Sequence, residues 1–203
     1  MTVIEVSEVV ELVLGRDVEE RRRAAALLLV RYAGFHGDRR FSPWFPREQR
    51  VLGDVAQVAR QVFAGHAPDA RVADLKDVVQ AGLEDSDPDG PPFAAEVFDH
   101  LVFADEVLAF LSCPENGEAL ARAYERAEEL AEAHEEMGRE GYEGEDGWKP
   151  AALGELEWAA RTRDAQDALD NVALDRSAAF ASLYADVIAR CYTDEDAGGG
   201  LDS

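Results

Sequence analysis

The sequence contains little cysteine and no long apolar run. Cys113 and Cys191 are its only cysteines, too few for a disulfide framework or a tetrahedral zinc site, so we expect two reduced thiols. No continuous apolar stretch reaches the length of about 18 residues that a membrane-spanning helix needs. The N-terminal stretch has no basic leader and carries Glu5, Glu8 and Glu11, unlike an export signal. These absences predict a cytoplasmic protein.

Positive charge is scarce along the whole chain. Its 20 lysine and arginine residues face 43 aspartate and glutamate residues, which gives a formal net charge of -23 at pH 7. Nucleic acids and anionic membrane surfaces attract proteins through positive fields, so this charge argues against both as partners. Charge alone does not name a partner, but it permits a basic protein, because carboxylates steer the encounter with positive charge. The oligomeric state stays open.

Apolar residues recur at helical spacing over most of the chain, and no alternating strand pattern extends beyond the first few residues. The length of 203 residues suits one domain with a sizeable core. We therefore predict an all-α fold, a single multi-helix bundle of about seven to eight helices over residues 1–192. Residues 193–203, rich in acidic residues and glycine, are predicted to form a disordered tail.

Capping signals support individual helices. Asp17 followed by Glu20 has the spacing of a capping box, and Pro46 suits the first position of a helix. The segment between these two helices breaks the periodicity, and we expect its Trp44 to cover the edge of the core. Further helices are predicted over about 70–83, over the apolar run before Pro114, over the Ala/Glu-rich run after Gly117, and over about 151–172 and 177–192.

The stretch "DSDPDGPPFAAE" matches the spacing of an EF-hand calcium loop. Asp85, Asp87 and Asp89 stand at alternate positions, Gly90 follows, and Glu96 stands where a bidentate carboxylate would close the loop. Its prolines argue against tight binding, because one of them removes the backbone N–H through which such loops pair, and the chain offers no second loop. We expect no tight calcium site and keep calcium binding as an alternative.

Carboxylate pairs allow a second alternative, a metal-dependent all-α nucleotide pyrophosphohydrolase. Glu125 with Glu128 supplies one magnesium-binding pair, and Asp164 with Asp167 approximates the other. Such pairs also arise freely in a chain with 43 acidic residues, and those on an Ala/Glu-rich helix are typical of a solvated face. Because the chain has no glycine-rich phosphate loop and no nucleophile motif, we lean towards a protein that is not an enzyme and predict no cofactor.

Two histidines fall within predicted helices. A carboxylate-bridged di-metal bundle needs a glutamate three residues before each histidine. Val97 stands at that position before His100, and Ala131 stands there before His134. His134 also belongs to the apolar face of its helix, so we expect it to pack as a hydrogen-bonded core residue.

Two loops combine aromatic and charged side chains, the combination that gives protein interfaces their anchors and their steering. The loop "RRFSPWFP" offers Trp44. The loop "REGYEGEDGW" is favoured, because its glycines leave the aromatic side chains little local structure to pack into. Its candidate partner-binding residues are Tyr142, Glu143, Glu145, Asp146 and Trp148.

Four segments together resemble a known family. They are "LLLVRYAGFHGDRRFSPW", "PREQRVLGDVAQVARQVF", "FAAEVFDHLVFADEVLAFLSCPENGEALARAYERAEELAEA" and "KPAALGELEWAARTRDAQDAL". In their order, their aromatic loop and the Arg/Asp pattern of the last helix, they resemble a bacterial all-helical family catalogued as domain of unknown function number four-sixteen, with its actinobacterial relatives. The resemblance covers about residues 22–171. It implies an all-helical, cytoplasmic protein without enzymatic activity.

Some members of that family look like immunity partners of secreted bacterial toxins. The leading expectation from the sequence is therefore a protein-binding module, such as a toxin-immunity or inhibitor protein. Calcium binding through residues 85–96 and metal-dependent pyrophosphohydrolysis remain the alternatives.

Overall fold

A computed structural model describes residues 5–67, 69–87, 90–140 and 151–192. Over these ranges all regular structure is helical and no strand occurs, which confirms the predicted all-α class. The nine helices include one more than the predicted maximum, because α3 is a single turn. They are α1 (Val6–Leu14), α2 (Val18–Arg31), α3 (Ala33–His36), α4 (Pro46–Phe63), α5 (Asp69–Asp85), α6 (Ala94–Ser112), α7 (Gly117–Glu140), α8 (Leu153–Gln166) and α9 (Asn171–Cys191).

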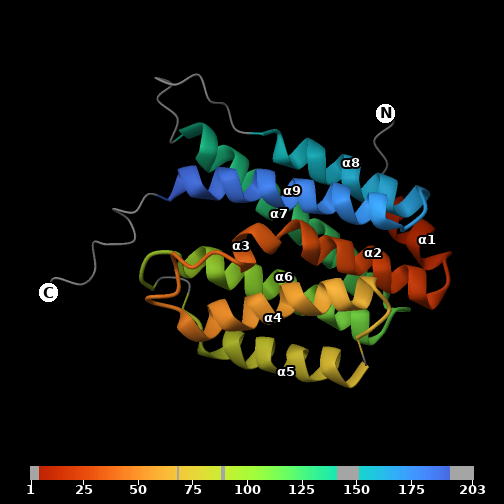
Figure 1. The fold of residues 1–203 in the computed structure, drawn as a ribbon, viewed down its shortest axis with the longest axis horizontal. Coiled ribbons are helices and arrows are strands. Elements are labelled where there is room, and N and C mark those ends of the chain that lie inside the picture. Colours follow the sequence, from red (N-terminus) through yellow and green to blue (C-terminus); the bar gives the residue numbers. More distant parts are fainter. Residues whose placement is uncertain (1–4, 68, 88–89, 141–150, 193–203) are drawn as a thin grey trace, which may run out of the picture.

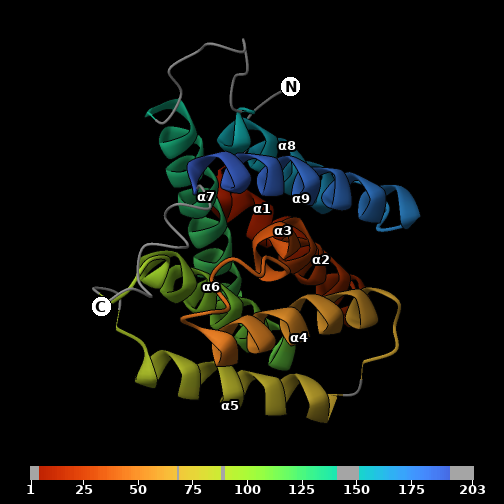
Figure 2. The same ribbon diagram turned by 60° about the vertical axis from the view of Figure 1, so that its left-hand side comes forward.

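Helix α2 lies in the middle of the bundle. It packs against α4 and α6 on one side and against α9 on the other, while α5 and α8 form opposite edges of the molecule (Figure 1). Figure 2 shows α7 running steeply across the direction of α4, α5 and α9. None of the helices in the described ranges combines the length and the apolar surface needed to cross a membrane.

The sequence of α2 explains its central place. The Asp17 side chain accepts a hydrogen bond of 2.9 Å from the Glu20 backbone N–H, which confirms the predicted cap. Every residue from Ala24 to Arg31 is buried, so this helix has neighbours on all sides rather than one apolar stripe. The small alanines let those neighbours approach, and the leucines after them supply apolar contact area. Only Arg31 brings charge into this buried run.

The loop before α4 is anchored by aromatic rings, as the sequence predicts. Phe41 is fully buried and stacks on Phe35 with ring centroids 4.9 Å apart. Trp44 is half-buried and packs against the core with its ring 6.1 Å from that of Phe93. It therefore covers the edge of the core, as expected.

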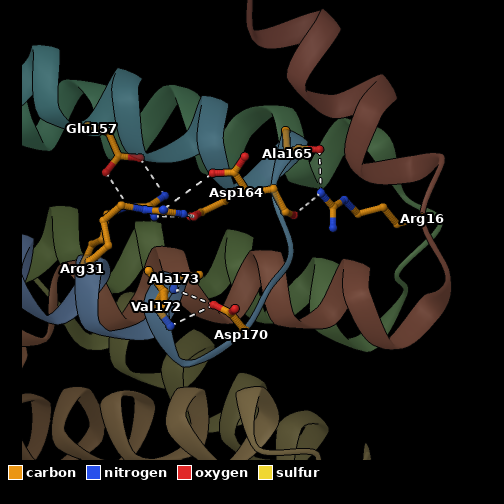
Figure 3. A network of polar contacts seen from close by, with 10 residues as sticks. Arg16, Arg31, Glu157, Asp164, Ala165, Asp170, Val172 and Ala173 are labelled. Carbon is orange, nitrogen blue, oxygen red and sulfur yellow. Dashed lines mark hydrogen bonds and ion pairs between the residues drawn. The ribbon is translucent and has the colours of Figure 1, made fainter.

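The predicted boundaries of the last two helices are wrong. Helix α8 stops at Gln166, and α9 already begins at Asn171. The Asp170 carboxylate caps α9 by accepting hydrogen bonds from the Val172 and Ala173 backbone N–H groups (Figure 3). At the end of α8, Arg16, which lies between α1 and α2, donates to the Ala165 carbonyl at 2.8 Å and to the Asp167 carbonyl at 2.7 Å. The Asp170 cap and the distant Arg16 together provide hydrogen-bond partners for backbone groups that the two helix ends leave free.

Helices α3 and α9 approach closely because Gly34 has no side chain. A Cβ atom built on Gly34 would lie 2.4 Å from the Ala181 carbonyl oxygen of α9. No such contact occurs between real atoms, so only glycine permits this packing. It places His36, at the end of α3, beside the interior face of α9.

Candidate functional site

A groove of about 1,100 Å³ lies between the C-terminal part of α7 and the start of α8. We call it the acidic groove. It is lined by Glu132, Glu135, Glu136 and Arg139 from α7, and by Ala151, Ala152, Gly154, Glu155, Leu156, Trp158, Ala159 and Thr162 from the α8 segment. Four glutamates against one arginine give its walls a strongly negative charge.

One of these glutamates holds the groove together. Glu135 is buried, accepts a hydrogen bond of 3.1 Å from the Gly154 backbone N–H, and is paired with Arg139. A Cβ atom built on Gly154 would lie 3.2 Å from the Glu132 side chain, so α7 and α8 are closely packed at this point. Glu135 therefore joins α8 to α7 and stabilises the positive end of α8.

The other three glutamates, Glu132, Glu136 and Glu155, are exposed and form no ion pair with any described residue. Beside them, Leu156 keeps 38% of its surface exposed and Trp158 is half-buried. The acidic groove thus offers three exposed carboxylates, unpaired among the residues that the structure describes, next to apolar surface.

The Trp158 ring is held in place from both directions. Its indole N–H donates to the Glu128 carboxylate, and the Arg161 guanidinium lies 3.8 Å from the ring centroid. Arg161 also donates to Glu128 at 2.9 Å. An aromatic surface fixed in this way loses little side-chain freedom when a partner covers it.

The sequence-predicted partner residues fall mostly outside the described ranges. Tyr142, Glu143, Glu145, Asp146 and Trp148 all lie in the stretch 141–150, which connects α7 to α8, and their role stays a prediction. Trp44 is described, and it packs against Phe93 at the edge of the core. The acidic groove itself was not predicted, because it depends on how α7 and α8 pair.

The calcium-loop residues have other partners. Asp85 pairs with Arg47, and Glu96 accepts a hydrogen bond from the Tyr192 hydroxyl. Asp87 is exposed, and Asp89 lies outside the described residues. Within the described ranges, no three or more histidine, cysteine, aspartate or glutamate side chains are grouped so as to hold a metal ion. Calcium binding stays an alternative prediction.

Three of the four predicted pyrophosphohydrolase carboxylates are compensated by arginines. Glu128 receives Arg161, as described above, and Asp167 lies 3.8 Å from Arg176. Asp164 is fully buried and also contacts Arg176, at 2.9 Å. Glu125 is exposed. Carboxylates engaged in this way have few oxygen lone pairs left for a metal.

Asp164 belongs to a buried cluster that joins α2, α8 and α9, which we call the arginine cluster (Figure 3). Arg31 donates to both oxygens of Glu157, at 2.7 and 3.0 Å, and to Asp164 at 2.6 Å, while Arg176 holds the second oxygen of Asp164. Arg31, Glu157 and Asp164 are all fully buried. Burial lowers the pKa of Arg31, but the two carboxylates outweigh it and raise that pKa above its ordinary value.

A second buried polar centre consists of His36, His100, Tyr184 and His134, which we call the histidine chain. The four side chains come from α3, α6, α9 and α7. His36 Nε2 lies 3.2 Å from His100 Nδ1, and His100 Nε2 lies 3.1 Å from the Tyr184 hydroxyl. That hydroxyl lies 2.9 Å from His134 Nδ1, which in turn lies 2.9 Å from the Leu130 carbonyl oxygen.

Burial keeps the histidine chain neutral. It lowers the pKa of His36 to about 3 and also lowers the pKa values of His100 and His134. Phe35 stacks on His100 at 4.0 Å, and Tyr32 meets the same ring edge-on. The prediction that His134 packs as a hydrogen-bonded core residue is confirmed.

His134 reaches the wall of a small cleft between α6 and α7. This cleft has a volume of about 210 Å³, and we call it the α6–α7 cleft. Its walls consist of Ala95, Glu96, Asp99, Arg126, Glu129, Leu130, Ala133, His134 and Met137. Burial raises the pKa of Asp99 in this wall. One end of the histidine chain therefore lies close to solvent, although His134 itself is only 2% exposed.

Comparison of the chain with protein-family models, with curated proteins and with solved structures gives no match. The resemblance to the all-helical bacterial family therefore stays a prediction. What the protein does has to follow from the chemistry of the acidic groove and of the histidine chain.

Proposed function

We propose that the protein is a binding module for a partner protein and that the acidic groove receives a basic segment of that partner. The observation that carries this proposal is the combination of three exposed carboxylates, none paired within the described residues, with the apolar surface of Leu156 and Trp158. Charge steers the encounter, and apolar anchors supply most of the binding energy. An immunity or inhibitor protein that covers a basic partner is the biological role this chemistry supports best.

The charge and exposure of its walls make the acidic groove a better site for a polypeptide than for a metabolite. Small-molecule pockets usually enclose about 300–1,000 Å³ and bury most of the ligand, with few charged groups. The acidic groove has about 1,100 Å³, and three of its glutamates lie at the surface. A peptide segment with several cationic side chains can meet all three at once.

Arginine is the cation that suits this site best. Its planar guanidinium binds a carboxylate through two parallel hydrogen bonds, and its weak hydration lets it lie against apolar and aromatic surface. The net charge of -23 adds a long-range attraction for a basic partner. The occupant is therefore an arginine-rich segment that also carries an aliphatic side chain for the surface of Leu156.

The test compares two triple variants of equal charge. The groove variant is Glu132→Gln, Glu136→Gln and Glu155→Gln. The control variant is Asp74→Asn, Asp77→Asn and Glu84→Gln on α5, at the opposite edge of the molecule, where these side chains are exposed (Figure 1). Fluorescence anisotropy with a short arginine- and leucine-rich peptide should give a Kd about tenfold weaker for the groove variant. The control should stay within about threefold of wild type.

Equal losses in the two triple variants would mean that the peptide responds only to net charge, and the proposal would fail. An inert peptide, together with magnesium-dependent hydrolysis of a nucleotide by the purified chain, would instead favour the pyrophosphohydrolase alternative.

A further inference from the structure

We infer that the Leu130 carbonyl fixes the direction of all protons in the histidine chain and that the chain is an acid sensor whose proton enters at His134 Nε2. The inference rests on the hydrogen-bond geometry of the core and does not depend on the proposed function.

The direction of each hydrogen bond in the histidine chain follows from which atoms can donate a proton and which can only accept one. A carbonyl oxygen only accepts, so His134 Nδ1, at 2.9 Å from the Leu130 oxygen, must carry its proton. The same N–H faces the Tyr184 oxygen, which therefore accepts from it and sends its own proton to His100 Nε2.

The order then continues to the far end of the chain. With Nε2 as acceptor, neutral His100 carries its proton on Nδ1 and donates it to His36 Nε2 at 3.2 Å. His36 is left with its proton on Nδ1. All three histidines are thus Nδ1–H tautomers.

This order leaves one vacant acceptor. His36 Nε2 and His100 Nε2 each already accept a hydrogen bond, so a proton could reach them only by breaking the chain. Within the described residues, two ring nitrogens of the chain are buried without a partner, His36 Nδ1 and His134 Nε2. The first carries a proton and is a donor, so only the second can take up another proton.

The surroundings also favour His134 as the entry point. It lines the α6–α7 cleft, whereas His36 and His100 are fully enclosed. Burial lowers the pKa of His134, but the Leu130 carbonyl and the Glu96 carboxylate act in the opposite direction. His100 has a histidine on either side, and both lower its pKa further.

The titratable and charged groups facing the chain come from every element around it. They are Tyr32 from α2, Glu96 and Asp99 from α6, Arg126 and Glu129 from α7, and Cys191 and Tyr192 at the end of α9, with Arg40 near Cys191.

Protonation of His134 creates a second N–H, at a buried atom that has no acceptor among the described residues. The new donor needs water or a carboxylate, so the protonated protein favours a hydrated, opened α6–α7 cleft. The direction of the pH effect follows from the number of protons that the closed and open forms bind. The closed form holds its histidine neutral and binds fewer protons, so acid favours the open form from the ordinary histidine pKa of about 6.5 down to the lowered value.

Nitrogen-15 NMR of the histidine side chains tests the proton order. At neutral pH, His36, His100 and His134 should all show the Nδ1–H pattern, with solvent-exposed His66 as the internal control. On acidification of the folded protein, His134 should titrate before His36 and His100. An Nε2–H tautomer at His134, or earlier titration of either partner, would overturn the inference.

Hydrogen exchange of the α6 and α7 amides tests the sensor. After correction for the intrinsic pH dependence of exchange, the opening constant of the cleft should rise about tenfold per pH unit below about pH 6, because opening takes up one proton. His134→Asn keeps a donor towards Leu130, because its amide stands in the place of Nδ1, but it cannot titrate, so its opening constant should stay flat. Tyr184→Phe is the second variant. It removes the donor to His100 Nε2, so His100 should then titrate as well. A pH-dependent opening that persists in His134→Asn would place the sensor elsewhere.

Discussion

The arginine cluster and the histidine chain both bury polar side chains completely, but only the arginine cluster buries charge. Arg31 has carboxylates on two sides, and each buried charge has an opposite partner at hydrogen-bonding distance. The histidine chain avoids charge, and each link is a neutral hydrogen bond. Charge compensation depends on keeping every partner, whereas neutrality depends on pH. The two centres should therefore fail under different conditions.

Removal of one charge from the arginine cluster should have the largest effect. Arg31→Met leaves Glu157 and Asp164 buried without Arg31, although Arg176 still contacts Asp164. We expect a loss of about 3–5 kcal/mol in the free energy of unfolding, measured by urea denaturation at pH 7. The triple variant Arg31→Met, Glu157→Gln and Asp164→Asn should recover part of that loss, since it leaves no buried carboxylate without its arginine, and Arg176 keeps Asp167 at 3.8 Å. A single variant as stable as wild type would mean that the cluster is hydrated.

Acid should act on the histidine chain and spare the arginine cluster. The folded pKa values of three histidines are lowered by burial, so the unfolded chain binds more protons below the ordinary pKa of about 6.5. The contribution of the neutral histidines to the free energy of unfolding is then fully present above about pH 6.5. It is lost as the pH falls from there towards their lowered pKa values in the folded protein. If all three stay neutral in the folded state, unfolding should become easier by about 3 kcal/mol between pH 6.5 and pH 5.5.

The same urea titrations across pH measure that slope. Global unfolding should take up about three protons, while opening of the α6–α7 cleft takes up one. Arg31→Met should lower the free energy of unfolding by the same amount at every pH, so that its dependence on pH keeps the wild-type slope. A wild-type curve that is flat between pH 6.5 and pH 5.5 would contradict the neutral chain.

A smaller effect is expected where α3 meets α9. Gly34→Ala forces a Cβ atom towards the Ala181 carbonyl and should push His36 away from its place in the histidine chain, at a cost of about 1–3 kcal/mol. The matched control is Gly53→Ala in α4, where an added Cβ meets nothing within 4 Å and should stabilise by about 0.5–1 kcal/mol. Opposite signs in thermal denaturation are the expected result. Stabilisation by both alanines would show that α3 can shift without penalty.

Local signals in the sequence were sufficient for most of the fold. Asp17 and Pro46 start helices where predicted, because capping depends on residues close in the chain. The break between α8 and α9 was predicted but placed too late in the chain, because a single cap at Asp170 sets the start of α9. Arg16, which binds carbonyls at the end of α8, lies 149 and 151 positions from them.

The polar centres and the groove depend on contacts between distant segments, which the spacing of residues does not reveal. Arg31 is 126 positions from Glu157, and His36 is 64 from His100. One local signal did exist, since Arg31 ends a buried apolar run where a charge requires a partner. Glu132 and Glu136 are exposed on α7, but the pairing of α7 with α8 that turns them into a groove was not predictable from the sequence.

The adjacent residues Arg31 and Tyr32 have a consequence for the order in which the molecule assembles. Tyr32 donates a hydrogen bond to the Ala127 carbonyl of α7 and lies against the histidine chain. Arg31 instead pairs with two carboxylates that both belong to α8. During synthesis the central helix is complete long before those carboxylates emerge, and until then its arginine cannot be enclosed without a large penalty. The N-terminal two-thirds of the chain therefore cannot close its own core. Folding is completed only when the last two helices are present, and a nascent or truncated chain without them exposes the run of α2 from Ala24 to Arg31 that is buried in the finished bundle.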